Sequence, residues 1–366
     1  MDFGSAIVSL GNMERMKNLM KWAEEGGSFT MAFIGGSITQ DCLATKHELC
    51  YAYLVNEWWK KNYPKSEFTY INAGIGATTS QFGVARVDSH VLRYQPDFVV
   101  VEFSVNDTAN DFFKETYEGL LRRILMSASK PAVLVVNTVQ YENGVNAQEY
   151  HNEIAKAYGL PICSMKNSLY EEVKKGTYSS KEITVDDLHP NDYGHRQMAD
   201  LIGNLLTEIK NAPESDVQRE VFPKECLTPN RFENSQYLQN DNSNPVLDGF
   251  RRDTEEQEAV KDVFKKGFIA SREGDSITFT ADCKSFAVQY RKTIRQPASI
   301  AIAIVDGKED EAVTLDGNFD ERWGDCPFIT TVAKDLPYGK HTLTIRVTET
   351  HEDDVLPFYL IGVITS

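Results

Sequence analysis

The pattern of hydrophobic and polar positions changes character near residue 212. Before that point, short apolar runs such as FTMAFIGG (29–36), DFVVVEFS (97–104) and AVLVVNTV (132–139) alternate with longer stretches whose apolar residues recur at helical spacing. Continuous runs rich in β-branched residues suit strands covered on both faces, as in a parallel sheet. The alternation therefore predicts an α/β domain over residues 1–212, with helices on both sides of a mostly parallel sheet.

The remainder of the chain has a different texture. Short alternating strands such as DSITFTAD (275–282) and HTLTIRVTE (341–349) are separated by turn signals such as VDGKED and LPYGKH. This spacing is typical of an all-β sandwich, which we expect over residues 226–366. The stretch 213–225 is polar and contains prolines, so it is expected to be a linker between the two domains.

The charge and hydrophobicity of the chain limit the classes of molecule it is expected to bind. With 38 Lys+Arg against 54 Asp+Glu, the formal net charge is −16, which disfavours nucleic acid and anionic membranes. No apolar run approaches the roughly 20 residues that cross a bilayer. The first residues lack a basic segment followed by an apolar core, so a cytoplasmic location is expected, which a removed leader would reverse. The cysteines are expected to be free thiols; they lie at 42, 50, 163, 226, 283 and 326.

Two similar stretches, FIGGSITQ (33–40) and EGDSITFT (273–280), each offer a serine as a nucleophile. A hydrolase of α/β type presents its serine on a tight turn between a strand and a helix, where helix N–H groups face developing negative charge. Ser37 follows an apolar strand and two glycines, and helical patterns come after it. Ser276 lies inside an alternating strand, where it is expected to be exposed. We therefore predict that Ser37 is the nucleophile.

The stretch DDLHPNDYGH (186–195) offers a base and its partner. His189 has the residue type whose ordinary pKa suits proton transfer near neutral pH. Asp186 precedes it by three residues and can fold back to hold the imidazole, whereas Asp187 is the neighbour that could be mistaken for it. Alone, the stretch could equally be a solvated acidic loop beside a capping histidine. His195 is expected to face outward on the following helix.

Four blocks then occur in order across about 200 residues: FIGGSIT, NAGIGATTS, FSVND and DDLHPNDYGH. Together they resemble the blocks of the SGNH branch of the GDSL hydrolases, which are esterases with a flavodoxin-like three-layer fold. Gly36 stands where that family usually has aspartate. The resemblance implies that Ser37, His189 and Asp186 form a catalytic triad. No GxGxxG or P-loop pattern occurs, and no histidines stand at metal-ligand spacing, so no cofactor and no metal are expected.

The resemblance also implies an oxyanion hole, formed by the backbone N–H of Ser37, a backbone N–H in the second block and the side chain of Asn106. Aligned on Asn72, the usual glycine of the second block falls at Ala77, with Gly76 just before it, and either N–H could donate. Asn106 read alone would be a turn residue that ends a strand.

An SGNH domain followed by a β-sandwich, here expected to be jelly-roll-like, resembles bacterial carbohydrate O-acetylesterases of the acetyl-mannan or acetyl-xylan type. Acetylated carbohydrate is thus the expected partner, and Trp323 and Tyr338, in turn-like segments, are candidates for sugar stacking. Ordinary packing is the alternative for both side chains. The alternatives for the protein are a general short-chain esterase, a thioesterase, an acyltransferase, or a carbohydrate-binding protein without activity. Self-association into a homo-oligomer stays open.

Overall fold

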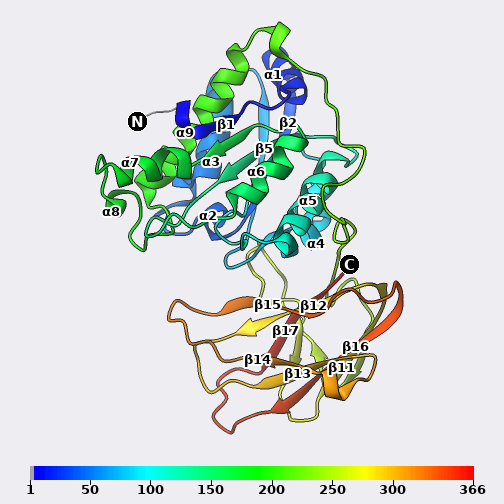
Figure 1. The fold of residues 1–366 in the computed structure, drawn as a ribbon. Coiled ribbons are helices and arrows are strands. Elements are labelled where there is room, and N and C mark those ends of the chain that lie inside the picture. The colour runs from blue at the N-terminus through cyan, green and yellow to red at the C-terminus, as the bar shows by residue number, and fades with distance from the viewer. Residues whose placement is uncertain (1–3) are drawn as a thin grey trace. The chain divides into compact units, whose positions relative to one another are not determined.

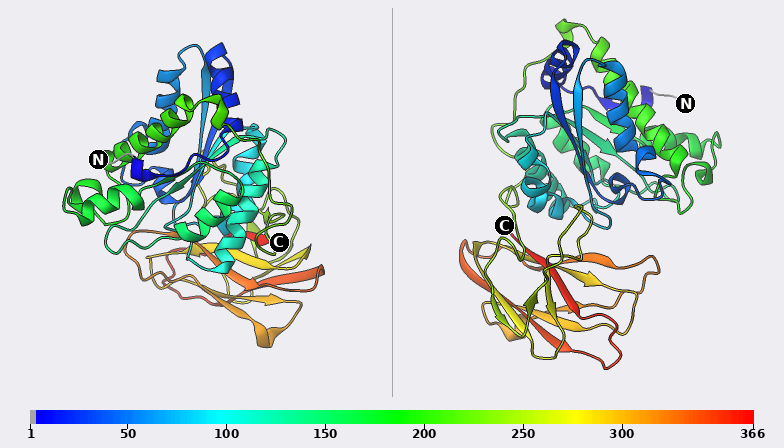
Figure 2. Two further views of the ribbon diagram at one scale, coloured as in Figure 1. Left: turned by 45° about the horizontal axis from the view of Figure 1, so that its top comes forward. Right: turned by 180° about the vertical axis from the view of Figure 1, so that it is seen from behind.

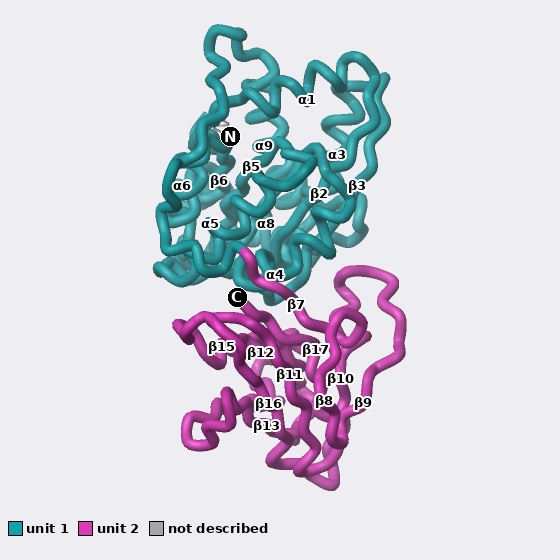
Figure 3. The backbone as a smooth tube through the Cα atoms, turned by 90° about the vertical axis from the view of Figure 1, so that its right-hand side faces the viewer, with its two compact units in different colours: residues 1–233 teal, residues 234–366 magenta. Residues whose placement is uncertain are grey.

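The computed structural model describes residues 4–366, and the chain divides into two compact units (Figure 3). Unit 1 comprises residues 1–233 and unit 2 comprises residues 234–366. The division falls after the stretch expected to be a linker and inside the range 226–366 expected for the sandwich.

Unit 1 is built on one sheet with the strand order β1-β6-β5-β4-β2-β3 (Figure 1). Its strands are β1 (Ile7–Ser9), β2 (Ser28–Gly35), β3 (Glu67–Gly74), β4 (Phe98–Glu102), β5 (Ala132–Asn137) and β6 (Ile162–Ser164). All pairs are parallel except that of β1 with β6. Counted along the chain, the five parallel strands lie in the order 2-1-3-4-5, which is that of flavodoxin-like folds.

The helices cover both faces of this sheet. They are α1 (Glu14–Glu25), α2 (Ser37–Gln40), α3 (Tyr51–Asn62), α4 (Ser80–His90), α5 (Asp111–Leu125), α6 (Gln148–Ala157), α7 (Glu171–Lys174), α8 (Ser180–Ile183) and α9 (Asp192–Asn211). Helices α1, α3 and α9 pack on one face, where Phe98 and Val100 point, and Figure 2 shows them together. Helices α4, α5 and α6 pack on the other, where Val99 and Val101 point. The predicted three-layer α/β fold is confirmed.

The stretch 213–233 is fastened to unit 1. Glu220 forms a salt bridge with Arg15 of α1, so residues 213–225 do not run free of the domain. Further along, the fully buried carboxylate of Glu118 on α5 accepts the backbone N–H groups of Leu227 and Thr228, both at 2.8 Å. The polar composition predicts a segment on the surface, and this segment is attached to α1 through Arg15 and Glu220 and to α5 through Glu118.

Unit 2 is a sandwich of two antiparallel sheets that share one core, as predicted. Its strands are β7 (Gln236–Leu238), β8 (Val246–Asp248), β9 (Arg251–Arg252), β10 (Phe268–Ala270), β11 (Ser276–Cys283), β12 (Phe286–Lys292), β13 (Ile300–Val305), β14 (Val313–Asp316), β15 (Cys326–Ala333), β16 (Gly339–Glu349) and β17 (Phe358–Thr365). Ser276 begins β11, and Ile277 and Phe279 point into the core. Ser276 is half-buried rather than exposed, since its end of β11 is paired on both sides, with β16 and β8.

Among the described residues, no helix is long and apolar enough to cross a membrane. The six cysteines, all of which lie in that range, are free thiols.

Candidate active site

Ser37 stands where β2 ends and α2 begins. It is the first residue of α2, a single turn of helix, and Gly36 separates it from the last residue of β2. Strand β4 lies beside β2, and β3 lies on the other side, so the chain reverses its winding direction at this point. Ligands of open α/β sheets bind outside the carboxyl ends of the strands at such a reversal. The sheet therefore places Ser37 where this fold binds ligands.

The structure brings His189 and Asp186 to Ser37. His189 Nε2 lies 2.8 Å from Ser37 Oγ, and His189 Nδ1 lies 2.7 Å from Asp186 Oδ2. The other carboxylate oxygen of Asp186 accepts the backbone N–H of His189 at 2.7 Å and that of Leu188 at 3.0 Å. This turn fixes the imidazole, because one carboxylate holds both the ring and the backbone of His189.

Asp187 points elsewhere. Its carboxylate forms a salt bridge of 2.6 Å with Lys181, and its backbone has a φ of 64°. Burial of the Asp186 carboxyl would raise its pKa, but the hydrogen bonds from His189 and Leu188 outweigh burial and lower the pKa to about 2. The hydrogen bond from Lys181 lowers the pKa of Asp187 as well, so the two acids differ in position, and only Asp186 lies beside the imidazole.

His189 is held in a setting that favours its protonated form. Burial would lower the pKa of His189, but hydrogen bonds with the side chains of Cys42 and Asp186 outweigh burial and raise it to about 9. An imidazole that binds a proton this firmly is well suited to receive one from Ser37.

Asn106 lies against Gly36. A Cβ built on Gly36 would fall 2.3 Å from Asn106 Oδ1, so any larger residue at position 36 would collide with this amide. Asn106 Oδ1 is buried and has no hydrogen-bond partner among the described residues. In this chain the absence of a side chain at position 36 lets the Asn106 amide lie directly against the backbone that precedes Ser37.

The second block approaches Ser37 through Gly76. A Cβ built on Gly76 would lie 3.6 Å from Ser37 Cβ, which places this loop beside Ser37. The Gly76 N–H, however, donates to Oε1 of Gln40 at 2.6 Å. Ala77 has a φ of 56°, a conformation that glycine adopts at no cost, which fits its place where the family has glycine.

Two side chains near Ser37, Gln40 and Glu102, were not predicted from the sequence. Glu102 ends β4 and is fully buried; burial raises its pKa to about 7, although Thr138, Thr39 and the Gly36 backbone donate to it. A lone glutamate inside the apolar run DFVVVEFS was a detectable signal. No local sequence pattern indicates the contact of Gln40 with Gly76, because the two residues are 36 positions apart in the chain.

The prediction for His195 is wrong. Its side chain is fully buried on α9, where Nδ1 accepts the backbone N–H of Tyr51 at 3.3 Å and Nε2 lies 3.2 Å from the Cys42 carbonyl. The imidazole therefore links α3 to the loop that follows α2. Sequence held the clue, because His195 shares its helical face with Met198, Ala199 and Ile202.

Trp323 and Tyr338 lie in unit 2 and are 59% and 73% exposed. Neither side chain lies in the core of the sandwich, so packing in that core does not account for an aromatic residue at these positions. Trp323 makes an edge-to-face contact with Phe319, with ring centroids 5.0 Å apart. Their role in binding stays a prediction.

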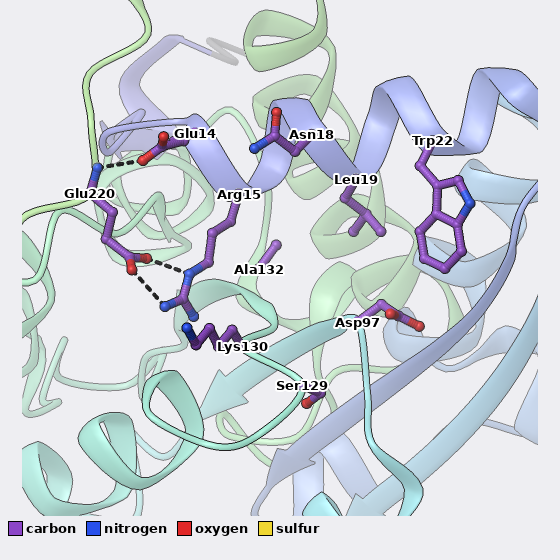
Figure 4. A pocket seen from close by; sticks show the side chains of 10 residues that line it. All are labelled: Glu14, Arg15, Asn18, Leu19, Trp22, Asp97, Ser129, Lys130, Ala132 and Glu220. Atoms are coloured by element: carbon purple, nitrogen blue, oxygen red, sulfur yellow. Dashed lines mark hydrogen bonds and ion pairs between the residues drawn. The ribbon is translucent and has the colours of Figure 1, made fainter.

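A separate cavity of about 390 Å³ lies in unit 1 near the amino ends of β4 and β5, away from Ser37 (Figure 4). Asp97 and Ala132 mark those strand starts, and Trp22 of α1 forms part of the wall. Within it, the Arg15 guanidinium is bound to Glu220 and to two backbone carbonyls. The charge of this guanidinium is thus already balanced by Glu220, and none of the residues that line the cavity belongs to the site at Ser37.

Comparisons with known proteins agree with this geometry. A model described as the GDSL-like lipase/acylhydrolase family matches residues 33–197. Thioesterase 1/protease 1/lysophospholipase L1 of Escherichia coli (strain K12) is 29% identical over 167 residues, covering 43% of this chain and 74% of that protein. Two crystal structures of a two-domain esterase active on acetylated mannans match with 48% and 47% identity and TM-scores of 0.96 and 0.97. Each match covers 100% of this chain and 98% of the other.

A serine paired with a histidine at the carboxyl edge of a flavodoxin-like sheet defines the SGNH type of hydrolase. The chain belongs to the GDSL-like lipase/acylhydrolase family, and it is a carboxylic-ester hydrolase of that type.

Proposed function

We propose that this chain is a serine esterase that removes O-acetyl groups from acetylated mannans through an acetyl-enzyme formed on Ser37. The observation that carries the proposal is the 2.8 Å contact between Ser37 Oγ and His189 Nε2. The choice of acetylated mannan as the substrate is supported by the match along the full length of this chain to a solved esterase active on acetylated mannans.

In the first half of the reaction, Ser37 Oγ attacks the acetyl carbonyl carbon while its proton passes to His189 Nε2. Asp186 holds the opposite ring nitrogen and stabilises the imidazolium. The tetrahedral intermediate then collapses: the bond to the sugar oxygen breaks, His189 gives its proton to that oxygen, and the deacetylated sugar leaves. The acetyl group remains as an ester of Ser37.

The negative oxygen of the intermediate needs donors that are free in the resting enzyme. We assign this role to the Ser37 N–H, the Asn106 side-chain amide and the Ala77 N–H. The Gly76 N–H is not assigned, because Gln40 already accepts it. The start of α2 at Ser37 adds the favourable end of a helix, although a single turn contributes little.

In the second half, a water molecule attacks the acetyl-enzyme and gives its proton to His189 Nε2. Collapse of the second intermediate releases acetate, and His189 returns the proton to Ser37 Oγ. Each turnover therefore consumes one water and restores the resting pair.

We also propose that unit 2 binds the polysaccharide through Trp323 and Tyr338, whose exposed rings can stack on sugar faces. Replacing either by alanine should weaken retention on mannan and leave p-nitrophenyl acetate turnover unchanged. Val355→Ala is the matched control, since Val355 is 60% exposed in the same unit but has no ring. Equal retention by all three variants would remove these rings from the binding surface.

The test of the activity is acetate release from acetylated glucomannan, acetylated xylan and their oligosaccharides. Ser37→Ala is the blank, and Ser276→Ala, in the similar stretch of unit 2, is the matched control. Release should be greatest from glucomannan, vanish in Ser37→Ala and persist in Ser276→Ala. Release greatest from xylan would change the substrate, turnover of p-nitrophenyl acetate alone would leave a general short-chain esterase, and an active Ser37→Ala would overturn the mechanism.

A further inference from the structure

A second histidine–aspartate pair lies buried next to Asn106. Asp107 Oδ2 is 3.0 Å from His151 Nε2, and the two side chains are 0% and 1% exposed. Asp107 directly follows Asn106 in the chain, and His151 comes from α6. Neither side chain has a role in the reaction proposed above, so the pair requires another explanation.

The Asp107 carboxylate joins the two loops that supply the assigned oxyanion donors. Its Oδ1 accepts the backbone N–H of Ser80 at 2.8 Å. Ser80 is the first residue of α4, three positions after Ala77, and the preceding residue gives this helix no side-chain cap. The carboxylate therefore caps α4 from another loop, where its negative charge also suits the helix N-terminus.

His151 fixes the carboxylate in this position. A carboxylate only accepts hydrogen bonds, so His151 Nε2 carries the proton that joins them. The imidazole stacks on the ring of Tyr117 from α5, with centroids 3.6 Å apart and planes 2° from parallel. The start of α6 is tied to the same loop, because the Ala147 N–H donates to the Ser104 carbonyl at 2.7 Å. The His151 ring is thus placed by its own helix α6 and by the ring of Tyr117 from α5, while its Nδ1 is buried without a hydrogen-bond partner among the described residues.

We propose that Asp107 and His151 are positioning residues that set the Asn106 amide and the Ala77 N–H at their places around the oxyanion; this rests on the proposed function. Burial of two such polar side chains costs desolvation free energy, and apolar side chains of similar size often stabilise a fold at least as well. What the pair adds is a fixed distance between the two loops. A displacement of about 1 Å at a reacting centre can cost about 10²-fold in rate.

The first test replaces His151. Leucine removes the donor at similar volume, whereas glutamine carries an amide nitrogen near the place of Nε2. For p-nitrophenyl acetate, kcat per active site, counted by the acetylation burst, should fall about 10- to 100-fold in His151→Leu with KM little changed. His151→Gln should recover most of this loss. The apparent pKa of the rate profile should stay that of wild type, because the His189–Asp186 pair is untouched.

A merely structural role would lower the number of active sites, not the turnover of each. A kcat per site in His151→Leu within about 2-fold of wild type would overturn the proposal, as would a full loss that His151→Gln does not relieve. In an Asn106→Ala background, the effect of His151→Leu should shrink, because the two changes act on one oxyanion hole. Independent, multiplicative effects would also contradict it.

A second pair of variants serves if His151→Leu fails to fold. Ser80→Pro removes the N–H that Asp107 accepts, at the first helical position where proline is tolerated. Ser80→Ala keeps this N–H and removes only the hydroxyl, which is 2.6 Å from Thr116 Oγ1. Turnover should fall in Ser80→Pro and not in Ser80→Ala. Equal turnover in the two variants would overturn the proposed role of the hydrogen bond from the Ser80 N–H to Asp107. Failure of the proposed function would show separately, as unchanged turnover in Ser37→Ala and Asn106→Ala.

Discussion

Asp186 and Asp187 are adjacent acids with different partners, and their difference gives a matched pair of variants. Asp186→Asn leaves the turn of residues 186–189 in place but removes the charge that stabilises the imidazolium of His189. The value of kcat should therefore fall about 10³- to 10⁴-fold. Asp187→Asn loses a surface salt bridge with Lys181, which contributes little. Steady-state hydrolysis of p-nitrophenyl acetate checks both. Equal losses in the two variants would contradict the assignment of Asp186.

The raised pKa of His189 predicts a pH dependence. Only neutral imidazole accepts the Ser37 proton, so kcat/KM should rise with pH and level off above the pKa of about 9. The linkage to stability runs the other way: a raised pKa stabilises the fold below the unfolded value near 6.5, and this contribution is lost as pH rises through the folded value. A pH–rate profile checks the first expectation. Cys42→Ala should move the midpoint downward, and a midpoint at an ordinary histidine value in wild type would contradict it.

Sequence could predict single residues where the relevant contacts are local. The D-x-x-H spacing suffices for Asp186 and His189, because one turn brings them together. Gln40 and Gly76 are 36 residues apart, and their contact depends on how β2 and β3 pair, which no local pattern contains. His195 is different, since its helical phase already placed it on the apolar face of α9.

At the scale of elements, the junction of β2 and α2 depends on Gly36. In Gly36→Ala the new Cβ would meet Asn106 Oδ1 at 2.3 Å, so the amide must move away from Ser37. The expected loss in kcat is about 10²- to 10³-fold, as for removal of one oxyanion donor. Kinetics with p-nitrophenyl acetate measure it. Gly339→Ala in unit 2, where a Cβ meets nothing within 4 Å, is the control; wild-type turnover in Gly36→Ala would contradict the close approach.

The apolar runs predicted β2, β4 and β5, because strands covered on both faces leave an unbroken apolar stretch, but the parallel strand β6 has only three residues and was not predicted. Their order in the sheet did not follow from the sequence, since pairing is non-local. Strand β1 was missed because its three residues are only half-buried at the edge. The single turn α2 was missed because four residues are too few to show a helical period.

At the scale of the whole molecule, the segment 213–233 belongs to unit 1. A chain ending at 233 should unfold cooperatively and hydrolyse p-nitrophenyl acetate like the full chain. A chain ending at 212 would lose the hydrogen bonds from the Leu227 and Thr228 N–H groups to the Glu118 carboxylate, each of which contributes about 1.5–3 kcal/mol. Thermal unfolding and activity of the two truncations check this. Equal stability would contradict the attachment of the segment.

The proposed catalytic contact between Ser37 and His189 affects how the enzyme acquires activity during folding. Ser37 and His189 are 152 residues apart, so their contact closes a long loop that contains most of the sheet. We expect this contact to form late in folding, because closing so long a loop costs chain entropy before the contact can stabilise the fold. In a nascent or partly folded chain, Ser37 would therefore lack its contact with His189. The rate at which hydrolysis returns after denaturation should report the formation of this long-range contact, not the initial collapse of the chain.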